Sequence, residues 1–407
     1  MSQPFTGVRV LDFTQVFAGP FGSYQLALFG ADVIKIERPG GDDMRYGPPN
    51  KEWSDRGLGT GWMAINSNKR NIALDLTKPE AIAIVKRLAE TADVVMENFR
   101  PGVMDKLGIG YEALSKVNPR IIYAAVSGFG QNGPERTTGA YDGKIQAMSG
   151  LMSITGSAES GPTRAGFAVC DAIGGMSLAF GVASALFQRT HTGKGQLVDV
   201  AMLDSALTFM SSFVVDYTVG GHVQGPAGNR AQSRLPTADL FKVKDGHLLL
   251  AVNNDKQFIE LAKAIGHPDL PKDPRFVDWP ARIANEVALR AIIEEVFASA
   301  DAATWDARLT AANVPCSRIW SIADVVKHPQ LKERTVLQKI DSPHGEVELV
   351  ASGIRLAHGG AEIKQFPVMP GADTDAVLGE AGYSAGEIAA FKAAGVATSG
   401  LRAGRKK

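Results

Sequence analysis

The sequence has few cysteines and no excess of either charge. Only Cys170 and Cys316 occur among 407 residues, which excludes a disulfide framework and a cysteine-based zinc site. Lys and Arg total 43, as do Asp and Glu, and this balance argues against a nucleic-acid groove or an anionic membrane surface. The longest apolar stretch, residues 176–187, is shorter than the ~20 residues that span a bilayer. We therefore expect neither nucleic acid nor membrane as a partner.

Several local patterns are also missing. The N-terminal residues lack a basic and apolar leader, which predicts a cytoplasmic protein. The first β-α turn lacks the Gly-x-Gly-x-x-Gly fingerprint, which argues against a nicotinamide oxidoreductase, although the topology alone leaves that class open. No P-loop occurs, and the seven histidines show no metal-ligand spacing. The basic residues 404–407 predict a frayed tail.

One motif matches a hydrolase pattern but lacks its partners. Residues 382–386 fit the nucleophile elbow Gly-x-Ser-x-Gly. That fold places a histidine after the serine, yet no histidine follows His358. We instead expect Ser384 and Glu387 to form a capping box at the start of the last helix.

The order of apolar segments predicts an α/β fold. Strands at 8–13, 32–37, 94–96 and 121–126 alternate with helices over the first 130 residues, which is typical of a doubly wound parallel sheet. The length exceeds the ~250–300 residues of a single core, so a second domain is expected. The predicted division is a large domain over 1–218, a Gly- and Pro-rich linker over 219–236, a small α/β domain over 237–325, and a linker with return to the large domain over 326–407.

Asp171 is the strongest candidate for chemistry. It opens a long apolar helix predicted over 171–190, with Gly174 and Gly175 close behind it. Each glycine costs about 1 kcal/mol relative to alanine in a helix, so something must approach that backbone closely. One interpretation, which this segment alone favours, is an ordinary aspartate N-cap. The other is a nucleophilic carboxylate, kept ionised by the helix N-terminus, with free N–H groups near the glycines for an oxyanion.

A set of ordered motifs then makes the chain recognisable. They are Gly7–Thr14, Ala18–Pro20, Leu28–Pro39, Asn68–Leu76, Glu97–Gly102, Ser127–Gly130 and Gly193–Gln196. Together they resemble the family III CoA-transferases, the superfamily of formyl-CoA transferase, carnitine CoA-transferase and α-methylacyl-CoA racemase. The resemblance covers nearly the whole chain.

The resemblance implies a transferase with Asp171 as its catalytic residue. In the family, this aspartate attacks an acyl-CoA thioester and passes through an aspartyl-acyl anhydride and an aspartyl-CoA thioester. Coenzyme A and acyl-CoA are substrates, a small carboxylic acid is the acceptor, and no metal or permanently bound cofactor is implied. The family fold is a large Rossmann-like domain built from both chain ends, an inserted smaller domain, and an interlocked homodimer.

The resemblance also assigns substrate-binding residues. It places Arg38 and Lys106 at the CoA phosphates, and it puts Gly228–Arg230 where the family carries a glycine-rich loop. The remaining positions line the CoA or the thioester: Val16, Phe17, Ala18, Leu74, Asp75, Leu76, Thr77, Asn98, Phe99, Arg100, Tyr141 and Asp142. Formyl-CoA transferase has glutamine at the position of Phe17, which argues against formyl and oxalate chemistry here.

Two other functions are considered beside the transferase. Racemases of this fold carry a histidine where this chain has Tyr141, and a two-base racemase needs a group on each face of the carbon. Tyrosine, with an ordinary pKa near 10, is a poor general base at neutral pH. We therefore favour a transferase and keep the racemase as the alternative. A noncatalytic CoA-binding protein would tolerate the loss of Asp171, so its presence argues against that class.

Overall fold

The chain forms two compact units. The computed structural model describes residues 2–402, so the predicted tail at 404–407 lies outside the described residues. The first unit contains Met1–Leu151, Ala165–His222 and Pro329–Lys407. The second contains Met152–Arg164 and Val223–His328.

The first unit is built on a seven-stranded sheet. Its order is β14-β3-β2-β1-β4-β5-β8, in which β14 pairs antiparallel with β3 and the other pairings are parallel. The order reverses between β1 and β4, as in doubly wound folds, so the predicted α/β parallel sheet is confirmed. The strands are β1 (Arg9–Asp12), β2 (Asp32–Glu37), β3 (Lys69–Leu74), β4 (Val94–Glu97), β5 (Ile122–Ser127), β8 (Gln196–Ala201) and β14 (Ala397–Thr398).

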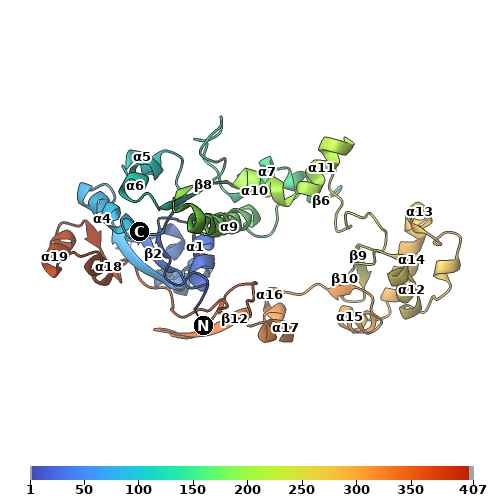
Figure 1. Ribbon diagram of the computed structural model, residues 1–407. Helices are drawn as coiled ribbons and strands as arrows, with labels where there is room; N and C mark the ends of the chain where they lie inside the picture. Colours follow the sequence, from blue (N-terminus) through green and yellow to red (C-terminus); the bar gives the residue numbers. More distant parts are fainter. Residues whose placement is uncertain (1, 403–407) are drawn as a thin grey trace. The chain divides into compact units, whose positions relative to one another are not determined.

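Helices cover both faces of this sheet. Val10 packs in one core with α1, α9 and α10, whereas the next residue, Leu11, packs in the other with α4, α6, α18 and α19. Alternate side chains of a strand point to opposite faces, so each strand feeds both cores. Figure 1 shows the C-terminal helices α18 and α19 beside α4. The helices are α1 (Ala18–Leu28), α2 (Lys51–Asp55), α3 (Thr60–Met63), α4 (Pro79–Ala89), α5 (Val103–Lys106), α6 (Tyr111–Val117), α7 (Asp142–Met148), α9 (Val169–Thr192), α10 (Met202–Phe209), α11 (Ser211–Gly220), α17 (Pro329–Glu333), α18 (Thr374–Glu380) and α19 (Ala385–Ala393), with the 3₁₀ helix η1 (Asp43–Tyr46) and the hairpin β12 (Leu337–Ser342) and β13 (Gly345–Val350).

Helix α9 packs closely against α1 through glycines. A Cβ on Gly175 would lie 2.4 Å from the carbonyl oxygen of Ala18, and one on Gly22 would lie 2.8 Å from the carbonyl oxygen of Gly175. The close approach to the backbone at Gly175, which the sequence predicts, is therefore made by helix α1. By length and composition alone α9 could cross a membrane, contrary to the expectation from its longest apolar stretch, residues 176–187. Its inner face, however, belongs to the core shared with α1 and β5.

Two smaller predictions have clear outcomes. The capping box of α19 is confirmed, because the Ser384 side chain accepts from the N–H of Glu387 and the Glu387 side chain accepts from the N–H of Ser384. The apolar sequence over about 202–217 predicts one helix; this is wrong, since the chain forms α10 and α11 with a break at Met210.

The second unit has its own small sheet and core. Its sheet has the order β11-β10-β9 with antiparallel pairings, and Phe241, Phe258, Phe297 and Trp305 are buried in its core. The elements are α8 (Leu151–Ile154), which begins at the unit boundary, β6 (Gly156–Ser157), β7 (Gly161–Pro162), β9 (Leu240–Val243), β10 (Gly246–Leu250), α12 (Asp255–Ala264), η2 (Leu270–Lys272), α13 (Trp279–Ala284), α14 (Glu286–Phe297), α15 (Ala302–Ala311), β11 (Cys316–Arg318) and α16 (Ile322–Val325).

Candidate active site

Most of the predicted site residues follow the carboxyl ends of neighbouring strands. Val16–Ala18 follow β1, Arg38 follows β2, Asp75–Thr77 follow β3, and Asn98–Arg100 follow β4. Parallel strands end at the same edge of a sheet, and ligands of such folds bind there, near the point where the strand order reverses. The sheet thus collects at one edge residues that lie more than 80 positions apart in the sequence.

A first cavity, of about 290 Å³, contains Asp171. Arg100 and Asp171 are its only charged lining residues. The other predicted residues on its wall are Val16, Phe17, Ala18, Asn98, Phe99 and Tyr141. Residues that the sequence reasoning did not assign also line it: Gln15, Val103, Val126, Ser127, Gly128, Thr138, Gly139, Ala140 and Met202. Ser127 ends β5, so the strand-end rule applied to that strand could have found it.

A second cavity, of about 270 Å³, adjoins the first through the shared residues Gln15 and Phe99. Its wall is mostly apolar and includes Ile36 and Leu107. The predicted residues on it are Arg38, Leu74, Asp75, Leu76, Thr77 and Phe99. The Arg38 guanidinium forms an ion pair with Asp43 at 2.5 Å at this rim.

Two predicted residues line neither cavity. Lys106 is exposed at the end of α5. Asp142 is buried at the start of α7, and its carboxylate faces the N-terminus of α9. Within residues 2–402, His, Cys, Asp and Glu form no group of three placed to hold a metal ion.

Asp171 does not cap its own helix. Helix α9 begins at Val169, and its N-cap, Ala168, has no side-chain hydrogen bond. The cap is Asp142, whose Oδ1 accepts from the N–H of Cys170 at 2.8 Å and from that of Asp171 at 3.4 Å. The interpretation of Asp171 as an N-cap is therefore wrong. Among the described residues, its carboxylate accepts no hydrogen bond and forms no ion pair.

Burial controls the ionisation of Asp171. Desolvation, with a smaller contribution from the Asp142 carboxylate, raises the pKa of Asp171 to about 7. Burial thus opposes the expected effect of the helix N-terminus, which by itself favours the ionised carboxylate. Gly174 and Gly175 lie beyond the first turn of α9, where N–H groups bond within the helix, so they supply no free donors for an oxyanion.

Comparison with known proteins identifies the family. The family model of CoA-transferase family III matches residues 5–374. The chain is 42% identical over 339 residues to acetyl-CoA:oxalate CoA-transferase of Acetobacter aceti, covering 83% of this chain and 86% of that protein. It belongs to CoA-transferase family III. Its identity to succinate–glutarate CoA-transferase of Agrobacterium fabrum is 38% over 353 residues, covering 84% and 87% of the two chains. A crystal structure of a CAIB/BAIF family protein from Brucella suis superimposes with a TM-score of 0.84 at 34% identity, covering 94% of this chain and all of that one.

The resemblance and the enzyme class are therefore confirmed: the protein is a family III CoA-transferase. In this CoA-transferase, Phe17 lines the first cavity and stacks on Phe21, with ring centroids 5.6 Å apart. Arg230, in the segment matched to the family's glycine-rich loop, forms an ion pair with Glu286 inside the second unit.

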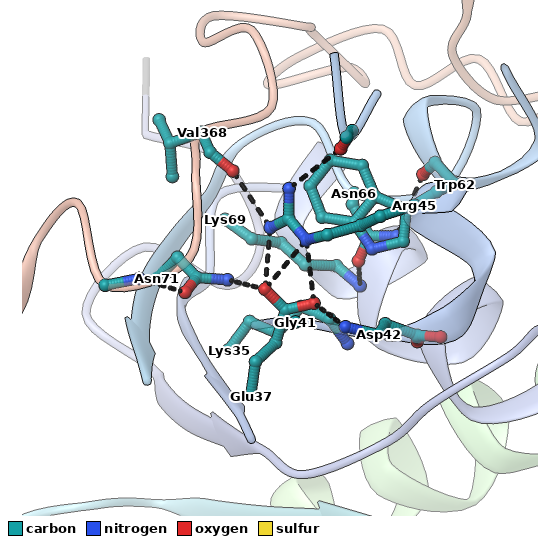
Figure 2. A network of polar contacts seen from close by, with 12 residues as sticks. Lys35, Glu37, Gly41, Asp42, Arg45, Trp62, Asn66, Lys69, Asn71 and Val368 are labelled. Carbon is teal, nitrogen blue, oxygen red and sulfur yellow. Dashed lines mark hydrogen bonds and ion pairs between the residues drawn. The ribbon is translucent and has the colours of Figure 1, made fainter. Parts of the chain in front are cut away.

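A buried ionic cluster lies behind the strand ends of this CoA-transferase. Arg45, which has no exposed surface, donates to both oxygens of Glu37, and its guanidinium lies 3.5 Å from the Trp62 ring centroid (Figure 2). Nearby, Nζ of the buried Lys69 lies 3.1 Å from Oδ2 of Asp12. Buried charges are tolerated when they are paired and hydrogen-bonded, and these pairs are.

Proposed function

We propose that this enzyme transfers CoA from an acyl-CoA donor to a carboxylic acid, with Asp171 as the covalent nucleophile. The observation that carries the proposal is the Asp171 carboxylate, which lacks a polar partner among the described residues and lines a cavity at the carboxyl edge of the sheet. A carboxylate is a usable nucleophile once ionised. Because Asp142 satisfies the N-terminus of α9, the Asp171 carboxylate is not used in capping.

The proposed reaction proceeds in four balanced steps. An oxygen of Asp171 attacks the donor thioester carbonyl, and the resulting tetrahedral adduct expels CoA thiolate to give the aspartyl-acyl anhydride. The thiolate attacks the aspartyl carbonyl, and the donor acid leaves as a carboxylate. The acceptor carboxylate then attacks the aspartyl-CoA thioester and expels the thiolate. Finally, the thiolate attacks the acceptor's acyl carbonyl and releases Asp171, so each demanding exchange is divided into easier ones.

The two adjoining cavities support this placement of CoA. The mostly apolar second cavity suits the adenine, with Arg38 at its rim for the phosphates. The first cavity then receives the thioester beside Asp171, with Arg100 as its one cationic lining residue. Lys106 is exposed on α5 and is proposed to contact a phosphate from outside the cavities.

The acceptor is proposed to be a small mono- or dicarboxylic acid. The names of the two curated relatives above include oxalate and glutarate, so both belong in the test panel, and the expectation against oxalate from Phe17 stays a prediction. Tyr141 is 78% exposed and replaces the racemase histidine, which supports transfer over racemisation.

The function is tested by measuring whether the enzyme moves CoA from one acyl group to another carboxylic acid. We would incubate the enzyme with acetyl-, succinyl- and glutaryl-CoA against a panel of free acids, and separate the thioesters by chromatography. A new thioester that forms without hydrolysis supports the proposal. Solvent deuterium entering an acyl α-carbon, with no new thioester, would instead indicate a racemase.

We expect the rate of enzyme acylation to rise with pH through about 7. Only the ionised carboxylate attacks, and the pKa of Asp171 is raised to about 7, so the rate constant should fall about tenfold per pH unit below that value. Single-turnover acylation by acyl-CoA, measured from pH 5 to 8.5, gives the midpoint. Removing the Asp142 charge in Asp142→Asn should move the midpoint downward. A flat profile over this range would contradict the assignment of Asp171.

We also propose a homodimer. Helices α9 and α11 present exposed apolar side chains, including Phe180 (75% exposed), Phe187 (69%) and Val219 (82%). Exposed apolar surface of this kind marks a protein–protein interface. Because the family fold is an interlocked homodimer, we propose that a second copy of this chain covers it. Light scattering should give about twice the 43.2 kDa chain mass, unchanged on dilution if the subunits interlock. Monomers at low concentration would contradict the interlocked arrangement.

A further inference from the structure

Two side chains form hydrogen bonds with the backbone between β1 and α1. Nζ of Lys35, which is buried on β2, donates to the carbonyl oxygen of Thr14 at 2.7 Å. The Asn98 side chain, after β4, pairs with both backbone groups of Gln15: its Oδ1 accepts from the N–H at 2.8 Å and its Nδ2 donates to the carbonyl at 2.7 Å. Residues 14 and 15 are therefore hydrogen-bonded to side chains from β2 and from the loop after β4, the two strands on either side of β1.

A third side chain holds Val16, whose backbone conformation is strained. Its φ is 64°, in the left-handed region that a β-branched residue rarely adopts. Oδ2 of Asp42 accepts from the Val16 N–H at 3.0 Å, and Oδ1 of Asp42 accepts from the N–H of Met44 at 2.9 Å. Such strain persists only where surrounding contacts determine the conformation, and Asp42 provides the contact at this residue.

Asp42 is itself fixed by the buried ionic cluster. It is 5% exposed, and its N–H donates to Oε1 of Glu37 at 3.0 Å (Figure 2). Glu37 is held in turn by Arg45 and by the Asn71 amide at 2.7 Å. A chain of contacts thus runs from the interior of the sheet to the turn at residue 16.

That turn forms one wall of the cavity that contains Asp171. Val16, Phe17 and Ala18 line it, whereas Asp42 lines the adjoining second cavity. The turn has little room to shift, since a Cβ on Gly19 would lie 2.5 Å from the Thr14 side chain. The position of residues 16–18 relative to the Asp171 carboxylate therefore depends on the conformation of Val16.

We propose that Asp42 is a positioning residue for the transfer reaction: it holds Val16 in the left-handed conformation and thereby places the wall of the Asp171 cavity. This inference rests on the proposed function of Asp171. Asp42 acts through the backbone of residue 16 and not by contact with the reacting carbonyl. A misplacement of about 1 Å at such a wall can slow a reaction about 100-fold.

The test is Asp42→Asn in two backgrounds. The amide oxygen still accepts from Met44, but the amide nitrogen cannot accept from the Val16 N–H. We expect the single-turnover acylation rate constant, measured at saturating acyl-CoA, to fall about 10- to 100-fold. Glycine adopts positive φ readily, so in the Val16→Gly background the same change should lower the rate less than about threefold. A purely structural role would not produce this rescue.

Hydrogen exchange supplies a readout independent of activity. The Val16 amide should exchange at least about tenfold faster in Asp42→Asn, because it loses its acceptor. The control is Asp93→Asn at the opposite edge of the sheet, where Oδ2 of Asp93 likewise accepts a backbone N–H, that of Arg9 at 2.9 Å. This control should change neither the acylation rate nor the Val16 exchange.

The outcomes separate the inference from the proposed function. An equal loss of rate in both backgrounds, or an unchanged rate despite faster Val16 exchange, would overturn the positioning role. Wild-type enzyme that no acyl-CoA acylates would overturn the proposed function and, with it, the catalytic part of the inference. The exchange result would then still decide whether Asp42 holds the turn.

Discussion

Replacing Asp171 with alanine should abolish transfer while leaving CoA binding intact. The variant removes the nucleophile, and losing a covalent nucleophile lowers kcat by about 10⁴-fold or more. CoA affinity should change little, because the proposed CoA contacts lie elsewhere along the two cavities. The decisive measurement traps the acylated enzyme with hydroxylamine. Wild-type enzyme incubated with acyl-CoA and then hydroxylamine should carry a hydroxamate on Asp171, which peptide mass spectrometry locates.

Stability provides the control for this variant. The pKa of Asp171 is raised in the folded state, so its ionised form disfavours folding and its contribution to stability falls as pH rises from about 4 through about 7. Asp171→Ala should therefore melt no lower than wild type at pH 8. The matched variant Asp375→Ala, at an exposed aspartate in the first turn of α18, should keep full activity. Transfer at wild-type rates by Asp171→Ala would refute the mechanism.

Replacing Arg45 with methionine should destabilise the protein by about 3–5 kcal/mol, because removing one partner leaves a buried charge unpaired. Burial raises the pKa of Glu37, but the Arg45 guanidinium, the Lys35 charge and the N–H of Asp42 together hold that pKa below its ordinary value. The variant also loses the contact with the Trp62 ring and a hydrogen bond to the carbonyl of Val368 at 3.0 Å. Urea unfolding at pH 8 measures the difference in unfolding free energy.

The pH dependence of this effect has a defined sign. Without Arg45, the pKa of the buried Glu37 carboxyl should rise, so protonation on acidification relieves the unpaired charge. In wild type the lowered pKa contributes stability at high pH that is lost on acidification. The deficit of Arg45→Met should therefore shrink from pH 8 to pH 5. The matched variant Arg56→Met breaks an exposed pair with Glu52 and should cost no more than about 0.5 kcal/mol. Equal losses in both variants would show that burial gives the Glu37–Arg45 pair no special role.

The parallel sheet could be predicted because its central strands are buried on both faces. Residues 32–37 were predicted as a strand and form β2 with those bounds. The strand β3 was missed as a strand because it begins with Lys69, Arg70 and Asn71. These polar side chains find partners only in the fold: Lys69 bonds Asp12, and Asn71 bonds Glu37. A local pattern cannot reveal partners that lie far away in the sequence.

By itself the sequence determined the fold class and the family and pointed to Asp171 as the candidate nucleophile, because apolar runs and ordered motifs are local properties. Only the tertiary structure decided the chemical state of the site. The cap of α9 comes from Asp142, 29 residues before Asp171, and burial, with the Asp142 charge, raises the pKa of Asp171 to about 7. Likewise, the N–H of Val16 finds its acceptor in Asp42, 26 residues away in the sequence. Desolvation and long-range hydrogen bonds arise only when distant segments pack together, so no reading of local pattern could supply them.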